Sequence, residues 1–155
     1  MTTTTNIRLT GRRMSYRDPA VVKRALFSRT WAVVGLTSHE YRAAHNVATF
    51  LQANGIRIVP VNPQAESVLG ERGYAHLSDI EFPIDVVDIF RRSDKAGQHV
   101  DEAIAISARC VWLQLGVVDE QAARRAQDAG LDVVMDACPK IEWPRYGPSR
   151  GSQAP

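Results

Sequence analysis

The sequence is poor in the features that mark several large classes of protein. It holds two cysteines, Cys110 and Cys138, among 155 residues, too few for the disulfide framework of a small secreted domain. No apolar run approaches the roughly 18–20 residues that a membrane span needs, and residues 1–13 lack the apolar segment of a secretory signal. Lys plus Arg (19) barely exceed Asp plus Glu (17), too even a balance to indicate nucleic-acid binding. We therefore expect a cytoplasmic protein that contacts neither membrane nor nucleic acid.

The length and composition indicate one globular domain with a tail at each end. A chain of 155 residues suits one domain and buries a core that needs no disulfide or metal. Residues 1–15 are expected to form a flexible tail, although their Arg-rich, acid-free character also resembles an organellar transit peptide. Residues 16–143 form the expected domain. Because Pro and Gly recur in the chain from Lys140 onward, we expect it to be irregular and to end in a loose tail at 144–155.

Two patterns of apolar residues alternate along the domain. Continuous apolar runs, typical of strands buried on both faces, occupy residues 30–35, 56–61, 85–90, 110–114 and 131–135. Apolar residues at three- and four-residue spacing, typical of amphipathic helices, occupy residues 40–54, 94–108 and 119–129. Asp18 followed by Pro19 predicts a further helix that ends near Phe27. The weaker stretch 64–80 is expected to hold a short helix around 65–69 and a short strand near Tyr74.

This alternation predicts the fold class and the place of any ligand. Buried strands joined by helices imply right-handed crossovers, and therefore an open sheet covered on both faces. The sequence thus predicts an α/β fold: a single doubly wound domain of Rossmann type, with a mainly parallel sheet of about five strands. Ligands of such sheets bind outside the carboxyl ends of the strands. Functional side chains are therefore expected in the loops that follow the strands.

The loop after the first predicted strand is the candidate phosphate site. Gly35 ends the strand, and Leu36 follows it. Thr37 and Ser38 come next and precede a helix. Such a loop offers unpaired backbone N–H groups, two hydroxyls and the positive end of a helix dipole to an anion. An ordinary turn in which Ser38 or His39 caps the helix explains the same residues, and neither Gly-x-Gly-x-x-Gly nor the Gly-Lys-Ser/Thr of a P-loop is present.

Cations at the same edge favour an anionic ligand. Arg91 and Arg92 follow the third strand, and Arg42 lies in the first turn of the helix that follows the first strand. A solvated surface position explains each arginine taken alone. The second strand ends in Asn62 and Pro63, without the carboxylate that usually binds the adenosine ribose of NAD. The pattern therefore argues against a NAD site.

Residues with catalytic potential form no recognisable set. The four histidines show no metal-ligand spacing, and no Gly-x-Ser-x-Gly sequence makes Ser38 a nucleophile. Asp88 lies in an apolar run and is expected to be buried and hydrogen-bonded. Cys138 follows the last strand at the ligand edge, where it either packs as a small side chain or meets the ligand.

Arg42 and several short phrases together resemble one known family. The phrases are residues 34–38, 55–63, 69–70, 86–92, 111–116 and 134–138. They are similar to those of small bacterial CoA-binding proteins, which are related to the N-terminal domain of the succinyl-CoA synthetase alpha subunit. The resemblance spans about residues 18–143 and implies a Rossmann domain that binds coenzyme A. In that family the loop after the first strand receives the phosphates, which here is the loop of Gly35, Leu36, Thr37 and Ser38. The resemblance assigns the rest of the nucleotide site to Asn62, Pro63, Phe90, Arg91, Arg92, Gln114 and Gly116.

We therefore expect a protein that binds CoA or an acyl-CoA without catalytic machinery of its own. The phosphohistidine segment and the nucleotide-binding partner subunit that the synthetase needs do not fit in 155 residues. Two alternatives stay open: an accessory CoA-binding subunit of an acyl-CoA ligase, whose protein partner is unknown, and a redox regulator that binds NAD(P). Cys138 adds a further expectation, a mixed disulfide with the thiol of bound CoA under oxidising conditions, against the alternative that it only packs.

Overall fold

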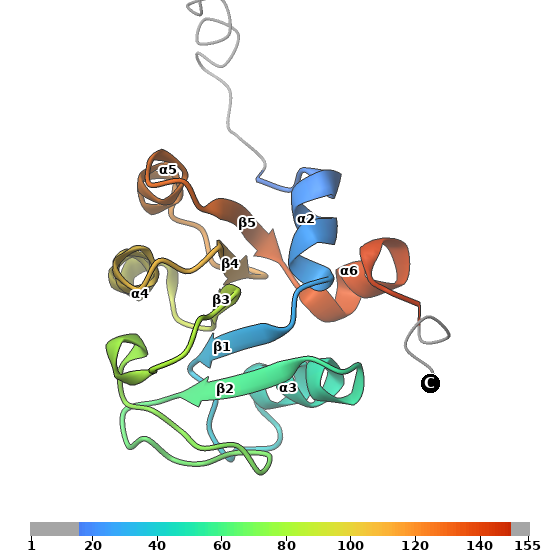
Figure 1. The fold of residues 1–155 in the computed structure, drawn as a ribbon, viewed down its shortest axis with the longest axis vertical. Coiled ribbons are helices and arrows are strands. Elements are labelled where there is room, and N and C mark those ends of the chain that lie inside the picture. The colour runs from blue at the N-terminus through green and yellow to red at the C-terminus, as the bar shows by residue number, and fades with distance from the viewer. Residues whose placement is uncertain (1–15, 150–155) are drawn as a thin grey trace, which may run out of the picture.

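Five parallel strands form one sheet at the centre of the molecule, in the order β2-β1-β3-β4-β5 (Figure 1). The computed structural model describes residues 16–149. The strands are β1 (Thr30–Val34), β2 (Arg57–Val61), β3 (Val86–Ile89), β4 (Cys110–Gln114) and β5 (Asp132–Ala137). The predicted α/β fold of Rossmann type is therefore confirmed.

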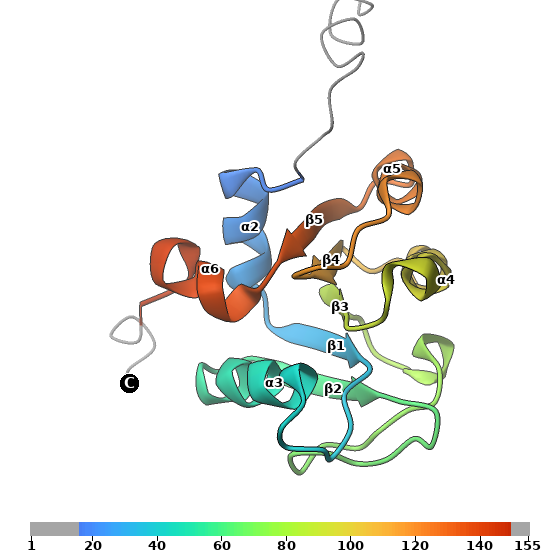
Figure 2. The ribbon, with the colours of Figure 1, turned by 180° about the vertical axis from the view of Figure 1, so that it is seen from behind.

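Helices cover both faces of the sheet (Figures 1 and 2). Three of them pack on one face: α2 (Pro19–Leu26), α3 (Ala43–Ala53) and α6 (Pro139–Tyr146). The other face is covered by α4 (Ser93–Ala105), α5 (Glu120–Asp128) and the short 3-10 helix η1 (Leu77–Asp79). Because successive strand residues point to opposite faces, a strand between two helical layers must be apolar at almost every position. Within residues 16–149, no helix is both long and apolar enough to cross a membrane.

The predicted start of the first helix is confirmed. The Asp18 carboxylate accepts a hydrogen bond from the backbone N–H of Ala20 at 3.0 Å, and Pro19 begins the helix. Asp119 caps α5 in the same manner, by accepting from the N–H of Ala122 at 3.0 Å. Each cap satisfies an N–H group that the first helical turn would otherwise leave unpaired.

The stretch after β2 differs from the prediction. Residues 65–69 form no helix, and Val68 instead pairs with Glu71 in a short antiparallel bridge. The strand expected near Tyr74 is reduced to a single bridge with Val61. The buried amide of Asn62, which hydrogen-bonds Glu66 through both of its polar atoms, holds the segment in a turn instead of a helix.

The irregular chain expected from Lys140 onward is also wrong, because α6 occupies residues 139–146. Pro144 and Gly147 have the sequence character of helix breakers, but Trp143 anchors the helix on the core. Its ring meets that of Phe50 on α3 edge to face, with 5.6 Å between centroids, and its indole N–H donates to the carbonyl of Pro148 at 3.0 Å. The packed body thus continues beyond the predicted domain end at residue 143. The expected tail at 1–15 and the last part, residues 150–155, of the tail expected at 144–155 lie outside the described residues.

One charged residue lies at the centre of the core. Asp88 on β3 is fully buried, between its strand partners Val33 and Trp112. Among the described residues, neither of its carboxyl oxygens has a hydrogen-bond partner, so the burial predicted from sequence is confirmed and the predicted hydrogen bonding is not. Burial raises the pKa of Asp88 well above its usual range, because the charged form loses its hydration there.

We predict that Asp88→Asn changes the dependence of stability on pH. Since the pKa of Asp88 is raised in the folded protein, the contribution of Asp88 to stability is most favourable below its unfolded pKa of about 3.9 and is lost as the pH rises. The neutral amide carries no such dependence. Urea denaturation at pH 4, 6 and 8 is expected to show the variant gaining on the wild type by more than about 1 kcal/mol across this range. A constant difference between the two proteins would contradict the prediction.

Candidate functional site

A pocket of about 350 Å³ opens at the carboxyl ends of β1, β3 and β4. We call it the carboxyl-end pocket, and its lining residues are Gly35, Arg42, Ala43, Ala44, Phe90, Arg91, Arg92, Gln114, Leu115 and Val117. The pocket lies between the ends of β1 and β3. From β1 the chain continues to β2 on one side of the pocket, and from β3 it continues to β4 on the other side. Open parallel sheets bind their ligands at such a reversal point. Six residues predicted from sequence meet here: Gly35, Arg42, Phe90, Arg91, Arg92 and Gln114.

The pocket carries a positive charge that few carboxylates oppose. Arg92 forms an ion pair with Asp94 at 3.2 Å. Within residues 16–149, no carboxylate lies within 4.0 Å of the guanidinium groups of Arg42 and Arg91. The arginines therefore retain hydrogen-bond donors for an anion, which planar guanidinium groups bind through paired hydrogen bonds.

Arg91 is held from behind by a histidine of α4. Its Nη1 atom lies 3.4 Å from Nε2 of His99, and Nδ1 of the same ring lies 2.9 Å from the carboxylate of Glu102. An imidazole that donates from Nδ1 to Glu102 has a lone pair on Nε2 to accept from Arg91. This chain of contacts directs the Arg91 guanidinium from α4 toward the pocket.

Gln114 at the end of β4 has a side-chain oxygen without a hydrogen-bond partner in the described part of the chain. Its side chain is 6% exposed and lines the pocket at the end of β4. Among the described residues, its Oε1 atom receives no hydrogen bond. A buried acceptor without a donor is costly, so this oxygen is a destabilising feature at the end of β4.

Gly35 lines the pocket and also serves the sheet itself. Its backbone N–H donates to the carbonyl of Val61 at 2.8 Å and is not free for an anion. A Cβ atom at Gly35 would lie 2.7 Å from the carbonyl oxygen of Phe90, and the glycine has a φ of +98°. Glycine is therefore required because the end of β1 lies against the end of β3.

The rest of the predicted phosphate loop lies outside the pocket lining. Leu36 is buried in the core, and the Thr37 hydroxyl accepts from the N–H of His39 at 3.4 Å. Both the N–H and the hydroxyl of Ser38 donate to the carboxylate of Glu66, at 3.2 and 2.8 Å. Capping of α3 by Ser38 or His39 is wrong, because Arg42 occupies the N-cap position and makes no side-chain capping bond.

Asn62 joins two loops and does not line the pocket. Its buried amide donates to the carbonyls of Leu36 and Glu66, both at 3.0 Å, and accepts from the N–H of Glu66 at 2.7 Å. The neighbouring Pro63 is exposed and also lies outside the pocket lining.

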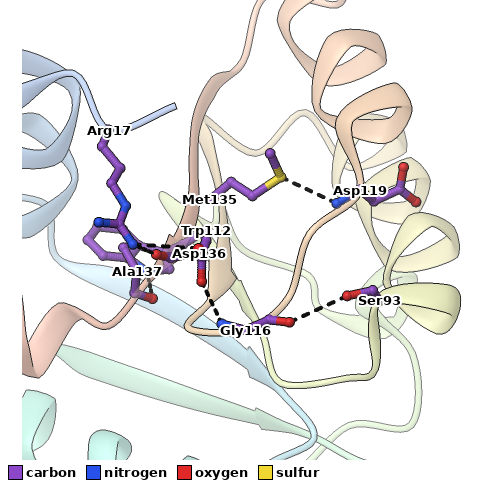
Figure 3. Close-up of polar contacts among 8 residues, drawn as sticks. All are labelled: Arg17, Ser93, Trp112, Gly116, Asp119, Met135, Asp136 and Ala137. Carbon is purple, nitrogen blue, oxygen red and sulfur yellow. Dashed lines mark hydrogen bonds and ion pairs between the residues drawn. The ribbon is translucent and has the colours of Figure 1, made fainter. Parts of the chain in front are cut away.

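Gly116 shapes the turn that carries part of the pocket lining (Figure 3). It has a φ of +87°, and its N–H donates to the Asp136 carboxylate at 2.7 Å. Arg17 in turn hydrogen-bonds the backbone carbonyl of Asp136 and lies 3.8 Å from its carboxylate. Ser93 contacts the Gly116 carbonyl at 3.5 Å. The turn after β4 is thereby connected to β5 and α4.

Cys138 lies away from the pocket lining. It is 8% exposed, occupies the N-cap position of α6, and packs in the core layer beneath α2, α3 and α6. Its environment is that of a packing residue. The mixed disulfide with CoA stays a prediction.

Sequence reasoning missed four apolar residues of the pocket: Ala43, Ala44, Leu115 and Val117. Their type carries no chemical signal. Leu115 is an exception in position, because a large apolar residue that directly follows a buried strand and is 54% exposed stands out from the polar residues usual in turns.

Comparison with known proteins identifies the family to which this fold and pocket belong. Residues 29–144 match the CoA binding domain family. The chain belongs to the CoA-binding domain family. The uncharacterized protein YneT of Bacillus subtilis is 37% identical over 114 residues, which cover 74% of this chain and 84% of YneT.

Two solved structures show the same fold in other proteins. A hypothetical protein from Pyrococcus horikoshii OT3 is 31% identical and superposes with a TM-score of 0.79, covering 87% of this chain and 96% of that one. An acetyl-coenzyme A synthetase from Ca. Korarchaeum cryptofilum shares the fold at 22% identity and a TM-score of 0.65. That match covers 74% of this chain and 28% of the synthetase.

We predict that Gly35→Val destabilises the fold, whatever it does to a ligand. The added side chain meets the Phe90 carbonyl and imposes a positive φ on a branched residue, and we expect a loss of at least about 2 kcal/mol in the free energy of unfolding. Gly116→Ala is the matched control, since its φ is also positive but no atom lies within 4 Å of the added Cβ. It is expected to lose about 1 kcal/mol. Equal losses in urea denaturation would contradict the close approach of β1 and β3.

Proposed function

We propose that this domain binds coenzyme A, or an acyl-CoA, in the carboxyl-end pocket and carries out no reaction of its own. Membership of the CoA-binding domain family supports CoA as the ligand in general. The observation that carries the proposed place is the cluster of Arg42, Arg91 and Arg92 at the reversal point of the sheet. CoA bears a diphosphate and a 3′-phosphate, and charge-assisted hydrogen bonds from arginine match such groups.

The remaining pocket residues fit the neutral parts of CoA. Gln114 supplies an amide side chain to the pocket lining, and the adenine and pantetheine parts of CoA carry groups that hydrogen-bond amides. Phe90, Leu115 and Val117 supply apolar surface on which an adenine ring or a pantetheine arm can pack. A pocket with a few placed polar groups among apolar walls is typical of cofactor sites.

The nucleophiles of the described chain support binding without catalysis. Burial raises the pKa of the Cys110 thiol, and a buried thiol is a poor nucleophile. Ser38 donates to Glu66, and these hydrogen bonds lower the pKa of that carboxyl. A carboxylate with a lowered pKa is a weak general base, so the pair is poorly suited to activating the hydroxyl.

A second candidate is an accessory CoA-binding subunit of an acyl-CoA ligase. The same fold occurs within a much longer acetyl-coenzyme A synthetase, which motivates a search for a separate catalytic chain. Co-purification of a nucleotide-binding partner that gains ligase activity with this protein would favour the accessory subunit over a stand-alone CoA-binding domain.

Calorimetric titration with CoA, dephospho-CoA, NAD and NADP tests the proposed ligand. We expect CoA to bind, dephospho-CoA to bind about tenfold more weakly because it lacks the 3′-phosphate, and the two dinucleotides to bind less well than CoA. Preference for NAD or NADP over CoA would instead establish the redox-regulator alternative.

We predict that Arg91→Ala combined with Arg92→Ala weakens CoA binding at least about tenfold and makes it less sensitive to salt, since fewer charges then contact the phosphates. The matched control is Arg29→Ala combined with Arg109→Ala, which removes the same charge at the amino ends of the strands. It should bind CoA like the wild type. Unchanged affinity of the first variant at low salt would remove these arginines from the site.

A further inference from the structure

The Glu66 carboxylate occupies the donor groups that the sequence offered to a phosphate. Ser38 donates to it twice, from the backbone N–H at 3.2 Å and from the hydroxyl at 2.8 Å. A backbone N–H and a neighbouring hydroxyl that converge on one anion form the pattern with which loops at strand ends hold phosphate oxygens. In the free protein, a side chain of the same chain fills that position.

The backbone of Glu66 is fixed, so its carboxylate is held near Ser38. Asn62 binds the N–H and the carbonyl of Glu66 at 2.7 and 3.0 Å, and the same amide binds the carbonyl of Leu36 in the loop that carries Ser38. On the other side, Gly73 packs so closely that a Cβ atom there would lie 1.9 Å from the Glu66 carbonyl. These contacts hold the two loops together without using the carboxylate.

Ser38 belongs to the loop that connects two residues of the carboxyl-end pocket. Gly35 and Arg42, which precede and follow Ser38 in the same loop, both line that pocket. A phosphate-bearing ligand that extends from the arginines toward Ser38 therefore meets a carboxylate. Like charges at hydrogen-bond distance repel, and Ser38 cannot give the same N–H and O–H to two anions.

We infer that Glu66 is an internal anion that competes with a phosphate of the ligand for the two donors of Ser38 and thereby weakens phosphate binding. The inference rests on the proposed function, because it concerns the same ligand. A phosphate reaches the loop only by displacing the exposed Glu66 side chain, while the backbone stays held by Asn62. The hydrogen bonds from Ser38 lower the pKa of Glu66, so the competing charge persists at neutral pH.

Glu66→Gln tests the inference. The amide keeps an acceptor for Ser38 but removes the charge, so CoA and inorganic pyrophosphate should each bind about fivefold more tightly, the gain appropriate to an exposed ion contact. The control is Glu71→Gln, which makes the same charge change in the same segment, where Glu71 pairs with Val68 through its backbone. It should leave both affinities unchanged. In a Ser38→Ala background, the gain from Glu66→Gln should shrink, because the contested hydroxyl is gone.

The outcomes separate the inference from the proposed function. If wild type and Glu66→Gln bind CoA and pyrophosphate equally, or if the variant binds more weakly because Glu66 contacts a ligand hydroxyl, the inference is overturned and CoA binding stands. If neither form binds CoA but pyrophosphate still binds the variant more tightly, the proposed ligand is wrong and the competition is supported. No binding of either ligand to either form overturns both. A lower melting temperature of the variant with unchanged affinities would show that Glu66 is only a tether.

Discussion

The close approach of β1 to β3 at the carboxyl edge of the sheet is the constraint on which the site depends. Gly35 and the Phe90 carbonyl are so near that no side chain fits between them. This contact brings the residues that follow β3, Arg91 and Arg92, beside the amino terminus of α3 with Arg42. A larger residue at position 35 would separate the two strand ends, and with them the charges that make the pocket an anion site.

Two sites at the carboxyl edge of the sheet contain charged side chains: the carboxyl-end pocket and the contact between Ser38 and Glu66. The carboxyl-end pocket holds arginines that few carboxylates oppose, whereas the donors of Ser38 are already bound to Glu66. The sequence predicted that the N–H groups of this loop bind the phosphates. Spacing in the sequence did not reveal that Glu66 accepts hydrogen bonds from Ser38 in the same loop. Arg42 links the two sites, because it ends the loop and lines the pocket.

Much of the fold was predictable because burial imposes a regular spacing on the apolar residues of each strand and helix. Strands covered on both faces must be apolar at almost every position, and this pattern located all five. Elements that depend on one long-range contact were not predictable. The helix α6 contains Pro144, and its position depends on Trp143 packing against Phe50, almost a hundred residues earlier in the chain. The segment after β2 is held by a single buried amide, that of Asn62, and its pattern of turn residues is equally compatible with a short helix.

The sequence by itself determined the sheet, the edge at which a ligand is expected, and the family. The sheet follows from the spacing of apolar residues, the edge from the residues at which the strands end, and the family from short sequence phrases. None of these depends on contacts with residues far away in the sequence. Only the tertiary structure decided which polar groups at that edge are free. Gly35 gives its N–H to Val61, and Ser38 gives both of its donors to Glu66. Arg91 rests on His99, and Gln114 keeps an oxygen without a partner in the described chain. Hydrogen bonds saturate, so the availability of a donor depends on residues far away in the sequence, and residue type alone does not contain that information.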